Sequence, residues 1–401
     1  MASPAVPDAA THQRVRIESV DVVRGIIMIL MALDHVRDFF GDASASPTNL
    51  ATASAGLFMT RWITHFCAPV FFLLTGTGAF LALRRRTVGE LSTFLVTRGL
   101  WLIFAELVIM RCLGWQFNFD FLLTMVTVLW ALGWAMIVLG ALVHLPVRVV
   151  TAFGIVLIAG HNLLDGVTPQ ALGAFAPLWN VFHVPGVLFA NGHRMVFLAY
   201  PLIPWIGVTA VGYGLGQLYT RWSVERRRTM LTRIGIALTA AFFLLRALNA
   251  YGDPGPWSAQ RSSLFTVLSF LNTNKYPPSL LFLLMTLGPA LLLLRAVDGR
   301  TPGWLRPAHV IGKVPMFYYA LHVALIHLIA VVICLVRYGS VHWMFESPTP
   351  DRFPVTQPPG WPLSLPATYL IWALVVVLLY PACRWFAALR QRRTDWWLSY
   401  L

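Results

Sequence analysis

The sequence predicts an all-α, polytopic integral membrane protein with about ten transmembrane helices and both termini in the cytoplasm. Of its 401 residues, 58% are hydrophobic and only 11% are charged, whereas soluble globular chains carry about 25% charged residues. The mean hydropathy is +0.69. Apolar runs of about 20 residues, the length that crosses a bilayer, recur along the chain. Arginines collect in alternate connections between these runs, which fixes the predicted orientation.

The predicted spans follow one another with short connections. They cover residues 20–40, 57–83, 93–112, 121–143, 147–164, 194–219, 230–250, 278–297, 311–336 and 363–388. A further apolar stretch at 175–190 contains two prolines, and we interpret it as an interfacial or re-entrant segment. The abundant aromatic residues, 16 Trp and 26 Phe among them, are typical of the belts at membrane interfaces.

The charge distribution supports an even number of spans. The net charge is +14, and clusters such as Arg84–Arg86 and Arg226–Arg228 fall in every second connection. This pattern is the positive-inside signal of a membrane protein, so we expect no nucleic-acid binding. We expect the chain to be an integral protein of a bacterial cytoplasmic (inner) membrane.

The organisation along the chain is simple. We expect a polar cytoplasmic tail at 1–17, a single membrane domain at 18–390 and a cytoplasmic tail at 391–401, with no cleavable signal peptide. The four cysteines lie singly in apolar runs, which argues against a disulfide framework. Long loops at 161–193, 251–277 and 338–362 are predicted on the outer side, where such loops often build sites.

Ionisable residues inside spans are the main functional signal, because they are costly and usually face a bundle interior or a water-filled cavity. In the first span, Arg24 and His35 differ by about 20° after three helical turns, and the rise between them is roughly 17 Å. Asp21 and Asp38 lie within about 60° of Arg24, and Asp34 lies at the flank. The first span therefore has one polar face.

Other polar residues share a depth with the outer end of that face. They come from five further segments and are His65, Glu106, Asp120, Asn272, Asn274, Lys275, His322 and His327. Each also has a structural interpretation. A lone histidine often only bonds a neighbouring helix, Glu106 could pair with Arg98 or Arg111, and Asp120 could cap a helix.

Two further patterns receive structural interpretations. The glycines in GTG at 76–78 and GYGLG at 212–216 indicate close helix packing rather than a nucleotide loop. His322 and His327 point about 140° apart on a helix and no HExxH motif is present, so we expect no metal.

Four blocks in order resemble a known family. They are RIESVDVVRGIIMILMALDH from residue 16, THFCAPVFFLLTG at 64–76, FLNTNKYPPSLLFLL at 270–284 and IGKVPMFYYALHVALIH at 311–327. Over about 16–390 the chain resembles transmembrane acyltransferases of the heparan-α-glucosaminide N-acetyltransferase catalytic-domain type, in particular their uncharacterised bacterial branch.

This resemblance implies an enzyme that takes an acetyl group from cytoplasmic acetyl-CoA and delivers it across the membrane to an acceptor, often a sugar. Arg24 and Gly25 match the family's RG pair. Asn272, Lys275 and Ser279 match an N-x-x-K pattern followed by a serine, and His322 matches a histidine in the penultimate region. His35 stands where the lysosomal enzymes have an amide side chain. Those enzymes carry their proposed catalytic histidine in the first outer loop, whereas 36–64 contains none here.

Acyl transfer needs a base for the acceptor and donors for the oxyanion. We predict that His35 is the base, oriented by Asp34 or Asp38, with either direct transfer or an acyl-histidine intermediate. His65 and His322 complete the predicted catalytic set. The predicted substrate and oxyanion groups are Asn272, Lys275, Ser279 and Glu106.

The predicted co-substrate is acetyl-CoA. Its phosphates need cationic partners, and Arg24 and Lys313 lead a set that includes Arg84–Arg86, Arg98 and Arg306. The predicted partners are the lipid bilayer, acyl-CoA and a glycan or small-molecule acceptor, and a homo-oligomer is compatible with the sequence. The rival hypothesis is a proton-coupled transporter of a small solute, which ten spans with a polar stripe also fit.

Overall fold

The computed structural model describes residues 17–43, 45–393 and 395–400. The predicted tail at 1–17 therefore lies outside the described residues except for Ile17. The main elements are α1 (Glu18–Phe40), α2 (Ala55–Thr64), α3 (Cys67–Ala82), α4 (Val88–Phe104), the π-helix η1 (Ala105–Trp115), β1 (Leu123–Val126), α5 (Val128–Leu142), α6 (Val147–Gly160), the short 3-10 segment η2 (His161–Leu164), α7 (Ala176–Phe182), β2 (Gly186–Ala190), β3 (Met195–Leu198), α8 (Leu202–Leu215), α9 (Leu218–Arg221), α10 (Val224–Leu248), α11 (Ser263–Leu271), α12 (Leu280–Val297), α13 (Arg306–Gly312), α14 (Pro315–Tyr338) and α15 (Leu365–Arg392).

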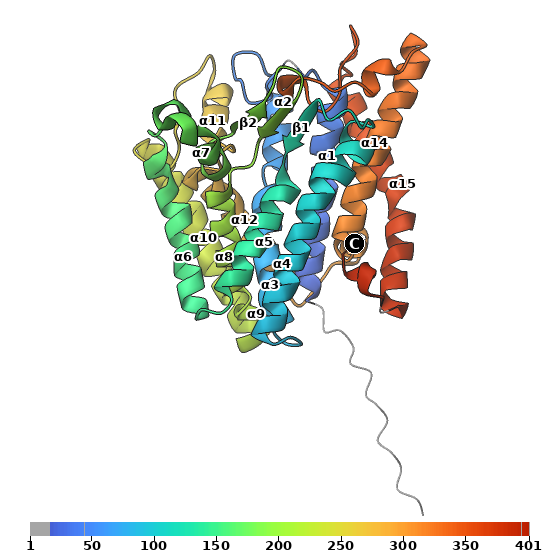
Figure 1. Cartoon of the computed structure of the whole chain (residues 1–401). Coiled ribbons are helices and arrows are strands. Elements are labelled where there is room, and N and C mark those ends of the chain that lie inside the picture. The colour runs from blue at the N-terminus through green and yellow to red at the C-terminus, as the bar shows by residue number, and fades with distance from the viewer. Residues whose placement is uncertain (1–16, 44, 394, 401) are drawn as a thin grey trace, which may run out of the picture.

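The long helices run roughly side by side and form one bundle (Figure 1). Among the described residues, seven helices or helix pairs are long and apolar enough to cross a membrane. They correspond to seven of the ten predicted spans. The other three predictions fall on α1, which carries many charges, and on α5 and α8, which are 15 and 14 residues long.

The fold is mostly helical, but not entirely. A three-stranded sheet in the order β1-β3-β2 replaces the first turns of the predicted spans at 121–143 and 194–219. β1 pairs with β3 in parallel, and β2 pairs with β3 in antiparallel orientation. The stretch at 175–190 forms α7 and β2 rather than one continuous helix.

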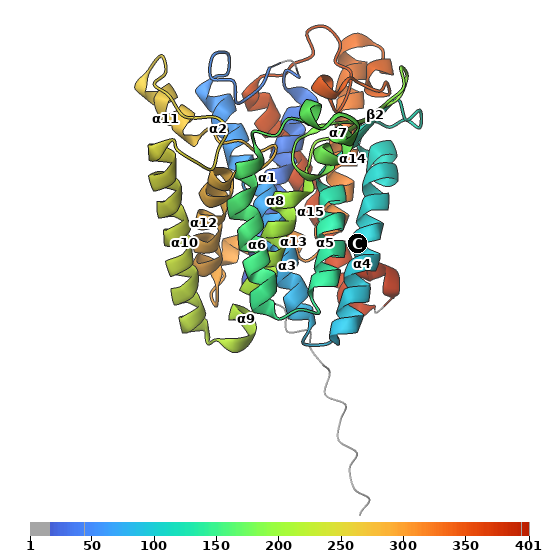
Figure 2. The same ribbon diagram turned by 60° about the vertical axis from the view of Figure 1, so that its left-hand side comes forward.

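The two ends of the bundle differ (Figures 1 and 2). The strands, α7, α11 and the three long loops lie at one end, which we call the sheet end. The connection between α3 and α4, which holds Arg84–Arg86, lies at the other, which we call the arginine end. Serine and threonine caps begin several helices, and Thr87 and Glu90 form a full capping box at the start of α4.

Glycines set the closest helix contacts, as the sequence predicted for the GTG and GYGLG stretches. A Cβ on Gly76 would lie 1.9 Å from the carbonyl oxygen of Thr209, and one on Gly212 would lie 2.1 Å from that of Leu73. Since no side chain fits at these distances, α3 and α8 pack backbone to backbone.

α1 lies inside the bundle and packs against α2, α3, α12, α13, α14 and α15. Nearly all of its apolar residues are buried, including Val22, Met28 and Phe39. The polar face of α1 is therefore held among protein neighbours rather than against lipid.

Candidate active site

A cavity of about 1100 Å³ extends along the polar face of α1. Its lining includes Asp21, Arg24 and His35, which belong to the face predicted from helical periodicity, and Asp34, which was predicted at the flank of that face. The other walls are lined by seven further cations, which are Arg84, Arg85, Arg86, Arg98, Lys275, Lys313 and Arg390. We call this space the inner cavity. It joins a cationic region at the arginine end to a histidine deep in the bundle.

Two glycines position the cationic wall beside α1. A Cβ on Gly25 would lie 1.7 Å from the carbonyl oxygen of Ala308, and a Cβ on Gly312 would lie 1.8 Å from that of Asp21. α1 and α13 therefore approach backbone to backbone. Because each glycine adjoins a cation in the sequence, this contact brings Arg24 and Lys313 to the same cavity.

The cations at this wall have defined partners. The Arg24 guanidinium donates to Asp21 Oδ1 at 3.0 Å and to the carbonyl oxygen of Gly312 at 3.3 Å. Arg390 donates to the carbonyl oxygen of Lys313 at 2.9 Å. Arg390 was not among the predicted CoA-binding cations, and Arg306, which was among them, does not line the inner cavity.

His35 and His322 form a buried pair, with His35 Nδ1 2.7 Å from His322 Nε2. His322 Nδ1 lies 3.0 Å from the carbonyl oxygen of Tyr318. A carbonyl only accepts, so His322 Nδ1 carries the proton, and a neutral His322 ring leaves Nε2 as the acceptor. His35 Nδ1 then donates to it. In this state the His35 Nε2 lone pair is the basic site of the pair.

Aromatic rings enclose the pair. The His35 ring meets the Trp115 ring edge-on, with centroids 4.8 Å apart, and lies nearly parallel to the His322 ring. His35 lines the inner cavity, whereas His322 is fully buried behind it. These contacts hold the His35 ring in one orientation.

The predicted orientation of His35 by Asp34 or Asp38 is wrong. Asp34 accepts from Arg61 at 2.7 and 2.6 Å and from the Thr64 hydroxyl at 2.8 Å. It also pairs with Arg37 at 2.8 Å. Successive helical residues point about 100° apart, so Asp34 faces α2 while His35 faces α14.

A second cavity of about 900 Å³ opens at the sheet end, and we call it the outer cavity. Its lining includes Arg37, Asp38, Arg61, His65, Asn272 and Lys275. Asp38 pairs with Arg37 at 2.5 Å, and the Asn272 amide donates to the carbonyl oxygen of Thr48 at 3.0 Å. The His65 ring packs edge-on against Phe282.

Lys275 lines both cavities. The Asp34–Arg61 ion pair lies between them, because Asp34 lines the inner cavity and Arg61 lines the outer one. A thin polar layer therefore separates a space that opens toward the arginine end from one that opens toward the sheet end.

Besides His322, two predicted site residues lie outside both cavities. Ser279 is fully buried, caps α12 and donates to Asp253 Oδ2 at 2.6 Å. Glu106 accepts from the backbone N–H of Thr127 at 3.2 Å and from the Thr127 hydroxyl. Glu106 does not pair with Arg111, which binds Asp120 at 2.9 Å. These residues support the walls rather than face a substrate.

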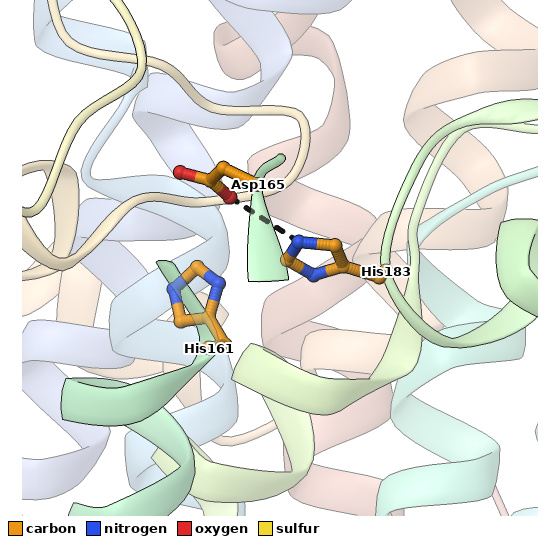
Figure 3. A group of neighbouring side chains, drawn as sticks. All are labelled: His161, Asp165 and His183. Carbon is orange, nitrogen blue, oxygen red and sulfur yellow. Dashed lines mark ion pairs between the residues drawn. The ribbon is translucent and has the colours of Figure 1, made fainter. Parts of the chain in front are cut away.

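Sequence reasoning missed one cluster, formed by His161, Asp165 and His183 at the sheet end (Figure 3). His161 and Asp165 are four residues apart, a spacing that places side chains on one helical face. Nothing in the sequence connects them to His183, which reaches them through the loop that contains α7.

Comparison with known protein families identifies one family that the chain matches. Residues 16–249 match the family described as "Heparan-alpha-glucosaminide N-acetyltransferase, catalytic". The matched region is more than half of the chain and includes Arg24 and His35, but it ends before Lys275 and His322. No curated protein matches the sequence.

Proposed function

Because the chain belongs to the heparan-alpha-glucosaminide N-acetyltransferase catalytic family, we propose that it is a membrane-embedded acetyltransferase. It moves an acetyl group from cytoplasmic acyl-CoA, with acetyl-CoA as the co-substrate, to an acceptor on the other side of the membrane. The single observation that carries this proposal is the inner cavity, since it joins a group of cations to His35. The acceptor is a sugar or glycan hydroxyl or amine.

The proposed topology has ten spans, with both termini and the arginine end in the cytoplasm. The arginine clusters support this orientation. α1 and α15 pack against each other, and the ends that carry Arg24 and Arg390 face the same cavity, as an even number of crossings requires. The host membrane is then a bacterial cytoplasmic membrane, and residues 18–390 form one membrane domain.

The cations of the inner cavity bind the phosphates of the donor. Arginine suits this role because its planar guanidinium offers several donors to phosphate oxygens. Arg84, Arg85 and Arg86 lie at the cytoplasmic mouth, while Arg24 and Lys313 lie on the wall made by α1 and α13. The thioester then extends along the apolar part of the cavity toward His35.

His35 acts as the general base. Its Nε2 takes the proton from the acceptor X–H group as X attacks the thioester carbonyl, and an oxyanion forms. The tetrahedral intermediate collapses with cleavage of the C–S bond, and the proton on His35 passes to the departing CoA sulfur. The products are the acetylated acceptor and free CoA. His322 is a positioning residue, because it fixes the tautomer that presents Nε2.

The residues of the polar layer assist this step. Lys275 lines both cavities, so its ammonium group is suited to stabilise the oxyanion where donor and acceptor meet. Asp38, His65 and Asn272 line the outer cavity and contact the acceptor. Asp34, Ser279 and Glu106 position the surrounding elements.

The test uses the purified chain in detergent. Acetyl-CoA is expected to raise the thermal midpoint, because a ligand that binds the folded state stabilises it. Radiolabelled acetyl-CoA supplied with a panel of amino sugars and glycans is expected to yield labelled acceptor and free CoA. A chain that shows no acetyl-CoA stabilisation and transfers no label, yet moves a solute in vesicles, would be a carrier instead.

A matched pair of variants sharpens this test. Arg85→Gln removes one cation of the mouth and is expected to raise the KM for acetyl-CoA by a few-fold, since exposed charge contacts are each worth about 0.2–1 kcal/mol. Arg352→Gln removes an exposed cation at the sheet end, outside both cavities, and is expected to leave the KM unchanged. Equal effects of the two would contradict the assigned donor path.

A further inference from the structure

The loop after α6 brings three potential metal ligands together (Figure 3). His161 begins η2, Asp165 follows it by four residues, and His183 follows α7. One ligand atom from each residue lies within 4.8 Å of the other two. His183 Nε2 is 3.2 Å from Asp165 Oδ1.

The histidines of this cluster are buried without adequate partners. His161 is 2% exposed and His183 is fully buried. Neither ring nitrogen of His161, nor Nδ1 of His183, has a hydrogen-bond partner among the described residues. The carbonyl of Pro278 lies near His161 without full hydrogen-bond geometry. Burying polar nitrogens without hydrogen-bond partners is costly, so these two rings are suited to bind a ligand between them.

The surroundings resemble the outer shell of a metal site. The Asn162 amide donates to Asp165 Oδ2 at 2.8 Å, which holds the carboxylate and leaves Oδ1 toward the histidines. Asn162 Oδ1 in turn accepts from the backbone N–H of Leu280 at 2.9 Å. Second-shell bonds of this kind orient the ligands of metal sites, and a backbone carbonyl such as that of Pro278 is a common partner of a ligating histidine.

We propose that His161, Asp165 and His183 bind a divalent transition-metal ion, Zn²⁺ in the first instance, at the sheet end of the bundle. Two imidazoles and one carboxylate are a known zinc ligand set, with a fourth position left for water. Nitrogen ligands disfavour Ca²⁺ and Mg²⁺, which take oxygen. Asp165 is the most exposed of the three ligands, so the ion enters and the water binds on its side.

The distances agree with this assignment. Two ligands about 2.1 Å from a tetrahedral zinc ion lie about 3.4 Å from each other, close to the 3.2 Å between His183 and Asp165. All three ligand atoms lie within 4.8 Å of one another, so a side-chain displacement of at most about 1.4 Å brings any two of them to the separation of a tetrahedral zinc site.

The role of the ion follows from the segments of the chain that it would connect. None of the three ligands lines either cavity, so the site is structural and does not rest on the proposed acetyl transfer. The ion would tie η2 to the segment after α7 and, through Asn162, to the start of α12. The segment just before α12 carries Lys275.

The experiment measures metal binding by the purified full chain without a polyhistidine tag. The protein is stripped with EDTA, dialysed against Zn²⁺ alone and analysed for bound metal, with Co²⁺ as a spectroscopic substitute. We expect one Zn²⁺ per chain, a tetrahedral Co²⁺ absorption band that Zn²⁺ abolishes, and a rise in thermal midpoint that EDTA reverses.

Variants assign the ligands. His161→Leu and Asp165→Asn are each expected to weaken Zn²⁺ binding by at least about 100-fold, whereas His193→Ala, an exposed histidine of the following turn, is expected to retain it. If a variant fails to fold, the Co²⁺ spectrum of the unaltered chain still shows whether the metal binds with tetrahedral geometry. Absence of stoichiometric binding by the unaltered chain, or binding that persists in both ligand variants, would overturn the proposal, and tighter binding of Mn²⁺ than of Zn²⁺ would overturn the zinc assignment.

Discussion

Two pairs of buried histidines differ in what their ring nitrogens meet. In the His35–His322 pair, each ring bonds the other, and the Tyr318 carbonyl fixes the tautomer. In the His161–His183 pair, three of the four ring nitrogens have no hydrogen-bond partner among the described residues, and the fourth, His183 Nε2, lies beside Asp165. The comparison teaches that burial and residue type do not define a histidine's role. In the first pair, the hydrogen bonds fix the tautomer of a ring that can then accept a proton. In the second pair, unpaired ring nitrogens lie close to a carboxylate, which is an arrangement suited to bind a cation.

The largest expected effect comes from breaking the first pair. His322→Leu removes the acceptor of the His35 Nδ1 proton, so the ring no longer presents Nε2 in a fixed orientation. We expect kcat for acetyl transfer to fall by about 10²–10⁴-fold, the usual contribution of general base catalysis. The KM for acetyl-CoA should change little, because His322 does not line the inner cavity.

The conservative variant distinguishes positioning from general damage. His322→Gln keeps an acceptor within reach of His35 and is expected to recover part of kcat. Equal loss in both variants, or a loss expressed in KM alone, would contradict the positioning role.

The next effect concerns the ion pair beside the first histidine pair. Asp34→Asn removes one charge from a buried network, leaves Arg61 without its carboxylate and leaves Arg37 with Asp38 as its remaining carboxylate. We expect a loss of about 3–5 kcal/mol in the free energy of unfolding, as for other broken buried pairs, measured by SDS titration in mixed micelles. Asp351→Asn, on an exposed loop, is the matched control and should leave the unfolding midpoint unchanged; a similar shift in both would remove the structural role of Asp34.

A smaller effect is expected at the glycine contact that positions the α1 wall. Gly25→Ala places a methyl group against the carbonyl oxygen of Ala308, and overpacking of this kind typically costs about 1–3 kcal/mol. Thermal unfolding in detergent measures it. Gly89→Ala, at a helical position with nothing within 4 Å of the new Cβ, should not destabilise the chain. An unaltered midpoint for Gly25→Ala would mean that α1 and α13 do not pack as described.

The smallest effect is expected at the second histidine pair in metal-free protein. Because neither ring nitrogen of His161 has a hydrogen-bond partner in the part of the chain that the structure describes, His161→Leu removes a buried polar group without breaking a hydrogen bond. We expect the EDTA-treated variant to unfold at the same temperature as the unaltered protein or slightly above it. A clear drop in the midpoint would show that His161 is already satisfied, and the contrast between the two pairs would fail.

The helical periodicity of the sequence predicted part of the candidate site, but it did not predict the contacts between distant segments. The face shared by Asp21, Arg24 and His35 follows from helix geometry alone, and all three line the inner cavity. The partner of His35 comes from 287 residues away, and no short-range pattern gives it. The same limit applies to Asp34, which was predicted to orient His35. Its partners Arg61 and Thr64 lie on α2, and the sequence of α1 alone does not indicate them.

The small sheet shows a second limit of sequence patterns. Leu123–Val126 and Met195–Leu198 are short apolar segments that adjoin apolar helices, so they were predicted as the first turns of spans. They form parallel strands because the chain between them returns to the sheet end, which hydropathy does not report. The His161–Asp165–His183 cluster was missed for the same reason, since the loop that carries His183 closes it.

The most direct test of the central claim is acetyl transfer by His35→Ala, compared with the unaltered chain and with His342→Ala, an exposed histidine at the sheet end. Transfer from radiolabelled acetyl-CoA to the panel of acceptors is measured beside the thermal shift with acetyl-CoA. The account predicts that His35→Ala loses at least about 100-fold in turnover and keeps the acetyl-CoA shift, while His342→Ala retains both. Turnover by His35→Ala at the rate of the unaltered chain would contradict the claim that His35 is the base.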